Sequence, residues 1–187
     1  IELWLDLIEA GSSPTAQQMA DTIPEDLFSS GKVAMLQYGS WAALTFSKNA
    51  DLADDVDVAR LPKGPVSNAS VVHGIGNVAN AKGGHVDLAK EFALFASGAE
   101  AAKIQGESGT VIPAFNGTQK AWVDAYPQYR VQTFIDAVET AVPYPASKNT
   151  TAWMTIESDV LAKVWSGSTD LDSGLRELAT KMQAALD

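Results

Sequence analysis

The chain has 187 residues, a hydrophobic fraction of 46% and a net charge of −10, and it contains no cysteine. This apolar content is enough for a buried core, while the shortage of Lys and Arg argues against a surface for nucleic acid or an anionic membrane. Without cysteine, a disulfide framework and a thiolate metal site are both excluded.

The first 30 residues predict three short helices. Apolar residues recur at helical spacing over residues 1–10, and Gly11 ends this helix. A second helix is predicted over residues 15–20. The third begins at Pro24, a residue suited to the first turn of a helix, and ends before Gly31.

Residues 33–38 are apolar and β-prone and predict a strand, which is followed by Gly39, Ser40 and Trp41. We expect the Ser40 side chain to cap a helix over residues 41–48. A large aromatic side chain beside exposed backbone amides at a strand-to-helix junction is typical of a ligand site in an α/β fold.

In the remaining chain, predicted strands first alternate with predicted helices, and the last part is predicted to be helical. Further strands are predicted over residues 56–61 and 70–80, and helices over residues 87–96, 99–105, 118–124, 130–138, 151–165 and 170–186. A Pro-rich connector covers residues 142–149. Strands that alternate with helices before a helical end indicate an α/β fold with a helix-rich C-terminal part.

Several segments carry a family resemblance in a fixed order. They are FSSGKVAM with GSW after it, VARLPKGP at residues 58–65, VVHGIGNVANAKGGHVDLAKEFALFASGAEAAKI at residues 71–104 and GTVIPA at residues 109–114. Together they resemble family 1 extracellular solute-binding proteins, the maltose-binding-protein-like receptors of bacterial ABC importers. Each segment alone is a weak signal, whereas the set covers most of the chain in register.

The resemblance implies a periplasmic-binding-protein-like, two-lobed α/β fold, of which this chain matches the C-terminal part. The first half of the fold would then be absent from the sequence. We expect residues 1–70 to form part of the C-terminal lobe. Residues 71–117 would supply the crossover strand and part of the N-terminal lobe, and residues 118–187 would return to the C-terminal lobe.

The same resemblance implies a bacterial, extracytoplasmic protein, either a cell-surface lipoprotein or a periplasmic one. Its ligand would be a carbohydrate, with an oligosaccharide as the favoured class. Its partners would be the permease subunits of an ABC importer and the missing N-terminal part of the same protein. We expect a monomer that needs no cofactor and binds no nucleic acid.

Trp41 is the first candidate for ligand contact, because the C–H face of a sugar stacks on an indole. The alternative is a core tryptophan at a helix N-terminus, and the resemblance favours the ligand. Tyr38 would add a hydroxyl or a second ring, unless it is a surface tyrosine at a strand end. Gly39 and Ser40 would offer backbone amides and a hydroxyl, although helix capping also explains Ser40.

His73 precedes Gly74 inside an apolar strand. A buried imidazole there needs a hydrogen-bond partner, which a ligand hydroxyl or a core or hinge group would supply. Gly74 is expected to give hinge freedom or a close backbone approach, and Asn77 is a further polar candidate. Trp153 follows the Pro-rich connector, where the resemblance implies a second cleft aromatic.

The other three tryptophans, Trp4, Trp122 and Trp165, lie in amphipathic helices and are expected to be packing residues.

No catalytic residue and no metal ligand are predicted. The chain has two histidines, no cysteine and no G-x-S-x-G motif, so a nucleophilic triad is not visible. The aspartates between residues 51 and 57 lack the spacing of a calcium loop and predict a solvated loop. Two alternatives to a sugar receptor stay open, a glycan-active hydrolase with a carboxylate pair and a binding protein for a non-sugar solute.

Overall fold

The computed structural model describes residues 1–186, which form two compact units. Unit 1 comprises residues 1–36 and 145–186, and unit 2 comprises Gln37–Tyr144. The chain therefore passes from unit 1 into unit 2 after Leu36 and returns after Tyr144.

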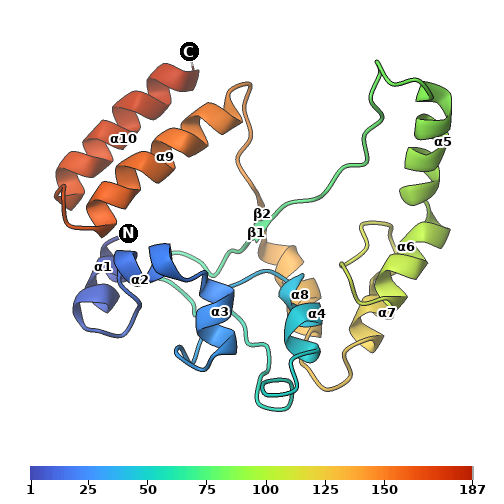
Figure 1. Cartoon of the computed structure of the whole chain (residues 1–187), viewed down its shortest axis with the longest axis horizontal. Helices are drawn as coiled ribbons and strands as arrows, with labels where there is room; N and C mark the ends of the chain where they lie inside the picture. The colour runs from blue at the N-terminus through green and yellow to red at the C-terminus, as the bar shows by residue number, and fades with distance from the viewer. Residues whose placement is uncertain (187) are drawn as a thin grey trace. The chain divides into compact units, whose positions relative to one another are not determined.

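The regular secondary-structure elements described in unit 1 are all helices. They are α1 (Glu2–Glu9), α2 (Ala16–Asp21), α3 (Pro24–Ser29), α9 (Thr150–Trp165) and α10 (Leu171–Leu186). α9 and α10 lie side by side as a helical hairpin (Figure 1). Leu27 of α3 and Trp153, Val160 and Val164 of α9 are buried.

Unit 2 combines short helices with one small sheet. Its elements are α4 (Ala42–Ser47), β1 (Val71–Val72), α5 (Val86–Ala96), α6 (Ala99–Glu107), α7 (Gln119–Asp124), α8 (Gln132–Ala137), a 3-10 turn (Val138–Thr140) and β2 (Val142–Pro143). β1 and β2 pair in parallel, with Val71 opposite Val142 and Val72 opposite Pro143. All ten helices predicted from the sequence are present, with ends that differ by a few residues.

The predicted strands are largely wrong. Within the described residues, residues 33–38 and 56–61 form no strand, and the predicted strand over residues 70–80 is reduced to Val71–Val72. These segments are apolar enough for a sheet, yet a strand exists only where another backbone completes its hydrogen-bond ladder. In unit 2 that happens only where Ser70 and Val72 accept from residues 142 and 144.

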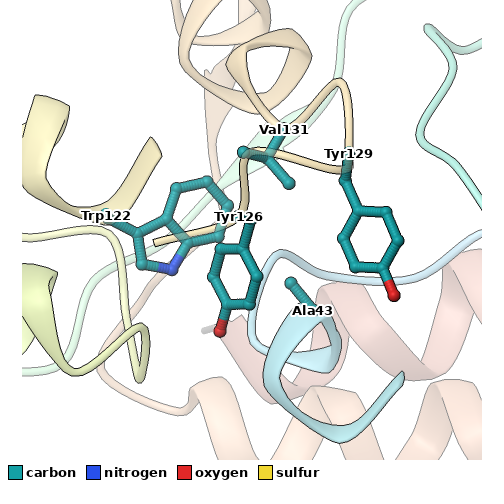
Figure 2. Packing of buried hydrophobic residues seen from close by; sticks show 5 residues of the cluster. All are labelled: Ala43, Trp122, Tyr126, Tyr129 and Val131. Carbon is teal, nitrogen blue, oxygen red and sulfur yellow. The ribbon is translucent and has the colours of Figure 1, made fainter. Parts of the chain in front are cut away.

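The core of unit 2 is built around the segment that joins α7 to α8. Tyr126, Tyr129 and Val131 come from this segment and Trp122 from α7, and Figure 2 shows Ala43 of α4 directed toward the two tyrosines. The rings of Tyr126 and Tyr129 stack with their centroids 6.3 Å apart. This cluster therefore anchors α4 against the α7–α8 segment.

Two aromatic side chains of this core share one acceptor. Trp122 Nε1 and Tyr126 Oη donate to the Gly109 carbonyl at 3.1 and 2.5 Å. Gly109 has φ of 71°, and a Cβ there would also collide with the hydroxyl of Tyr126. Burial raises the pKa of Tyr126, so its hydroxyl keeps the proton that it donates. Glycine is thus required at residue 109 both by the backbone conformation and by space.

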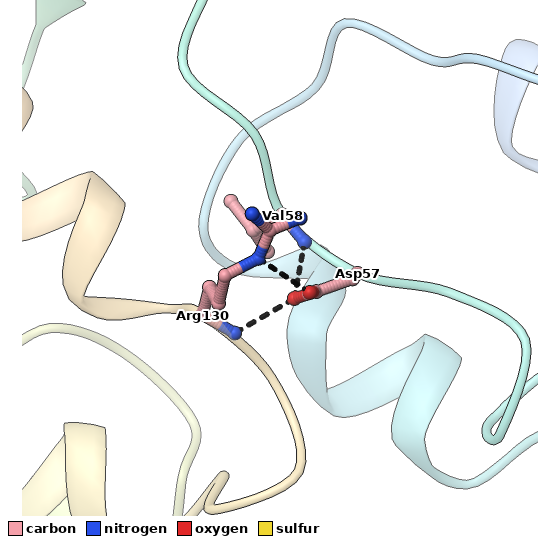
Figure 3. A network of polar contacts seen from close by, with 3 residues as sticks. All are labelled: Asp57, Val58 and Arg130. Carbon is pink, nitrogen blue, oxygen red and sulfur yellow. Dashed lines mark hydrogen bonds and ion pairs between the residues drawn. The ribbon is translucent and has the colours of Figure 1, made fainter.

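Asp57 ties the segment before β1 to the start of α8. Its carboxylate accepts from the backbone N–H of Arg130 at 2.7 Å, from Arg130 Nε at 2.6 Å and from the backbone N–H of Val58 at 2.7 Å (Figure 3). The Arg130 backbone hydrogen bond is the main cause that holds the pKa of Asp57 below its usual value of 3.8. Tyr129 adds a second tie, because its hydroxyl donates to the Ala53 carbonyl at 2.8 Å.

The tryptophans test the packing prediction directly. Trp122 is fully buried, as predicted for a core residue, and Trp165 is half-buried. Trp4 on α1 is 46% exposed, so it packs with only about half of its surface and is not a core residue. Helical spacing identifies an apolar face without showing whether anything covers it.

Trp122→Ala is expected to lower the free energy of unfolding by about 3–5 kcal/mol, because it empties a fully enclosed indole site. Trp4→Ala should cost less than about 1 kcal/mol, since its ring is already half in water. Denaturant unfolding followed by circular dichroism measures both. Equal losses would show that Trp122 is not the centre of the core.

Asp57→Asn is expected to lower the free energy of unfolding at pH 7 by about 1 kcal/mol, a small value because both partners are solvent-exposed. The folded pKa lies below the unfolded one, so the stabilisation is complete above pH 3.8 and disappears as the pH falls through the folded value. Unfolding curves between pH 7 and 3 should therefore show the variant and the wild type converging in acid. The matched control is Asp124→Asn, which removes an exposed pair with Lys120 inside α7.

Candidate functional site

Four aromatic rings from three separate segments of unit 2 come together in a continuous series. Ring centroids lie 5.5 Å apart for Tyr38 and Trp41, 6.0 Å for Trp41 and His73, and 6.3 Å for His73 and Tyr144. All three contacts are edge-on or tilted, with interplanar angles of 62°, 52° and 75°. We call these four residues the aromatic series.

The two-stranded sheet places His73 and Tyr144. Val72 and Pro143 are register partners, and the backbone N–H of Tyr144 donates to the Val72 carbonyl at 3.0 Å. Parallel strands leave their last pair at the same end of the ladder. Residues 73 and 144 therefore emerge side by side, and their rings meet.

The start of α4 places Trp41. Ala42 and Ala43 behind it are buried, and Ala43 belongs to the core described above. Trp41 itself is the N-cap residue, and the backbone carbonyl of Ser40 accepts from Ala43 at 3.2 Å. The prediction that the Ser40 side chain caps this helix is wrong, because no side-chain cap bond is made and the turn is closed by backbone carbonyls.

The aromatic series is open to solvent. Trp41 is 50% exposed and Tyr38 and Tyr144 are each 38% exposed, while His73 is exposed as well. Adjacent exposed aromatic rings form an apolar surface with polar atoms at the ring edges. Such a surface suits a ligand with flat apolar faces and a polar rim. Chemically it can stack on a ligand and hydrogen-bond to it.

A model of the bacterial extracellular solute-binding protein family matches residues 1–131, more than two thirds of the chain. The chain belongs to this family. The match includes three of the four residues of the aromatic series, and Tyr144 lies beyond it. A search of curated proteins gave no match.

Membership of the solute-binding family confirms part of the expectations drawn from the sequence. The chain has a substrate-binding role outside the cytoplasm, and its fold class is the predicted α/β binding-protein fold in helix-rich form. None of the helices in residues 1–186 is both long and apolar enough to span a membrane. The same residues hold no group of three or more His, Asp or Glu side chains arranged as metal ligands.

The structure brings together three of the residues singled out in the sequence, namely Tyr38, Trp41 and His73. His73 is exposed, so the expectation of a buried imidazole in need of a partner is wrong. The strand predicted over residues 70–80, which would have contained His73, ends at Val72. Gly39 lies directly beside the indole of Trp41.

Two other candidates from the same segment are not part of the aromatic series. A side-chain carbon at Gly74 would meet no atom within 4 Å, so the expected close backbone approach there is not found. Asn77 donates from Nδ2 to Ser97 Oγ at 3.1 Å, at the C-terminal end of α5. Its amide thus holds the residue-77 segment to the helix that follows.

Trp153 lies in unit 1 and is buried, with 7% of its surface exposed. Its Nε1 donates to Ser147 Oγ at 3.2 Å, which ties α9 to the connector. A cavity of about 400 Å³ lies beside it, lined mainly by apolar side chains from the connector and from α9 and α10. Glu157 and Ser147 are the polar residues in this lining.

Tyr144 is the member of the aromatic series that sequence reasoning missed. It stands between Pro143 and Pro145 in a segment interpreted as a connector. Proline on both sides favours an extended backbone and removes two hydrogen-bond donors, so the N–H of Tyr144 is the donor that this stretch offers to β1. An aromatic residue between two prolines was the signal available in the sequence.

Trp41→Ala should lower the free energy of unfolding by about 1 kcal/mol or less, because half of the indole already contacts water. Trp153→Ala should cost about 3–5 kcal/mol, because it opens a buried site and leaves Ser147 without its donor. Thermal and denaturant unfolding of both variants provide the comparison. A loss at Trp41 as large as that at Trp153 would assign Trp41 to the core.

Proposed function

We propose that the solute bound by this protein is a carbohydrate, above all an oligosaccharide, and that the aromatic series is its contact surface. The observation that carries the proposal is the exposed Trp41 ring flanked by Tyr38 and His73. Pyranose rings have apolar C–H faces and a rim of hydroxyl groups. They are therefore matched by aromatic faces with hydrogen-bonding groups beside them.

Each residue has a distinct role in this proposal. Trp41 is the stacking platform, and Tyr144 extends the aromatic surface along the ligand. His73 and Tyr38 supply hydrogen bonds to sugar hydroxyls, because both side chains carry polar atoms at their ring edges. Ser40 offers its hydroxyl at the start of α4.

Trp153 is proposed as a second stacking residue, which a ligand group would reach through the cavity beside it. The cavity volume falls within the range of small-molecule sites, and its lining joins apolar side chains to the carboxylate of Glu157. Gly74 and Asn77 remain candidates for ligand contact in the segment after β1.

The mechanism we propose is ligand-stabilised closure followed by delivery to the permease subunits of an ABC importer. A ligand shifts a conformational equilibrium only by its difference in affinity for the two states, so contacts made on closure drive it. The resemblance assigns residues 1–70 and 118–187 to the C-terminal lobe and residues 71–117 to the N-terminal lobe. No bond in the ligand is broken in this cycle.

The proposal is tested by thermal unfolding with a panel of mono- and oligosaccharides, with analysis of the sugar after incubation. A ligand at about 100 times its dissociation constant adds about 2.7 kcal/mol, which gives a clear rise in the unfolding temperature. Trp41→Ala should abolish this rise, whereas Trp4→Ala should keep it.

Two other outcomes would contradict the proposal. Release of a hydrolysed product would identify a glycan-active hydrolase with a carboxylate pair. A rise in unfolding temperature with polyols, phosphodiesters or peptides but with no sugar would identify a binding protein for a different solute.

A further inference from the structure

Gly39 lies under the ring of Trp41. A Cβ added to Gly39 would overlap three consecutive atoms of the six-membered ring, Cε3, Cζ3 and Cη2. A carbon that is almost equally near three consecutive ring atoms lies over the face of the ring and not at its edge. The indole therefore rests with one face on the Gly39 backbone.

Space alone requires glycine at this position. Gly39 is not among the residues with positive φ, so any L-residue could adopt its backbone conformation. What a larger residue could not do is share the volume that the indole of Trp41 occupies. The ring would have to leave its present rotamer.

The opposite face of the indole is left for a ligand. Tyr38 and His73 meet Trp41 at 62° and 52°, so neither of them stacks in parallel on a face of the indole. With one face on Gly39 and 50% of the residue exposed, the accessible area lies largely on the other face. The ring is thus presented flat instead of edge-on.

We infer that Gly39 is a positioning residue, which lays the indole of Trp41 flat and thereby sets the orientation of the stacking platform. The part of this inference that concerns ligand affinity rests on the proposed function. A side chain at residue 39 would tilt the indole and would also break its 6.0 Å contact with His73. Gly39 acts on the ligand through Trp41, in contrast to the role of amide donor expected from the sequence.

The first test is ¹⁹F NMR of protein labelled with 5-fluorotryptophan, which reads the ring without any ligand. The chain has five tryptophans, and the Trp41 signal is assigned by its loss in Trp41→Phe. Gly39→Ala should shift the Trp41 signal and leave the others in place. The control Gly84→Ala should shift none, because a Cβ there meets no atom within 4 Å.

A double-mutant cycle separates this clash from general damage to the fold. Gly39→Ala should lower the unfolding temperature of the wild type and have almost no effect in a Trp41→Ala background, where the ring is gone. Equal losses in both backgrounds would overturn the inference. So would a Trp41 signal that stays in place in folded Gly39→Ala.

The second test measures the affinity of the tightest sugar found in the panel. Gly39→Ala should weaken binding by about tenfold or more, since the platform is turned away from the ligand, and Gly84→Ala by less than about twofold. Unchanged affinity in Gly39→Ala would overturn the inference. If the wild type binds no sugar, the proposed function fails, while the ¹⁹F signal and the cycle still decide whether Gly39 positions Trp41.

Discussion

The packing of α4 against the α7–α8 segment is the constraint on which the rest of unit 2 depends. Ala43 lies in the same buried cluster as Tyr126 and Tyr129, so the short helix α4 is fixed from behind. A six-residue helix is too short to be stable by itself, and its position comes from tertiary contacts. Trp41 at its start is therefore held in place although half of its surface faces water.

Backbone pairing supplies the other half of the site. Two residues in each strand are enough to bring the segments at residues 73 and 144 together, because each hydrogen bond of a parallel ladder fixes the register of the next pair. His73 and Tyr144 are 71 positions apart in the sequence, and they meet through this short ladder. In the aromatic series, Trp41 is thus held in place by core packing behind α4, whereas His73 and Tyr144 are held by the hydrogen bonds of the two-stranded sheet.

Sequence reasoning predicted the helices well and the strands poorly, for a physical reason. Helical bonds are local, so the spacing of apolar residues and the glycines at helix ends carry most of the information. Residues 56–61 illustrate the opposite case. Val56 and Val58 pack on the core while Asp57 between them is exposed, which is strand-like alternation, yet no second backbone pairs with this segment.

The site was predictable in part. The Gly-Ser-Trp motif and the family resemblance were enough to single out Tyr38, Trp41 and His73. Tyr144 was not predicted because its partner is chosen by strand register, which an isolated connector does not reveal. The clash between a Cβ at residue 39 and the indole of Trp41 depends on the rotamer of Trp41. The spacing of residues in the sequence does not reveal that rotamer.

The aromatic series also sits at both places where the chain passes between its two units. Tyr38 follows the first passage by two residues, and Tyr144 is the last residue before the second. The two links differ in stiffness, because prolines flank Tyr144, whereas the stretch from Leu36 to Gly39 has no proline and ends in glycine. Because prolines flank it, the backbone of Tyr144 has few alternative conformations, so its ring keeps its place directly after β2.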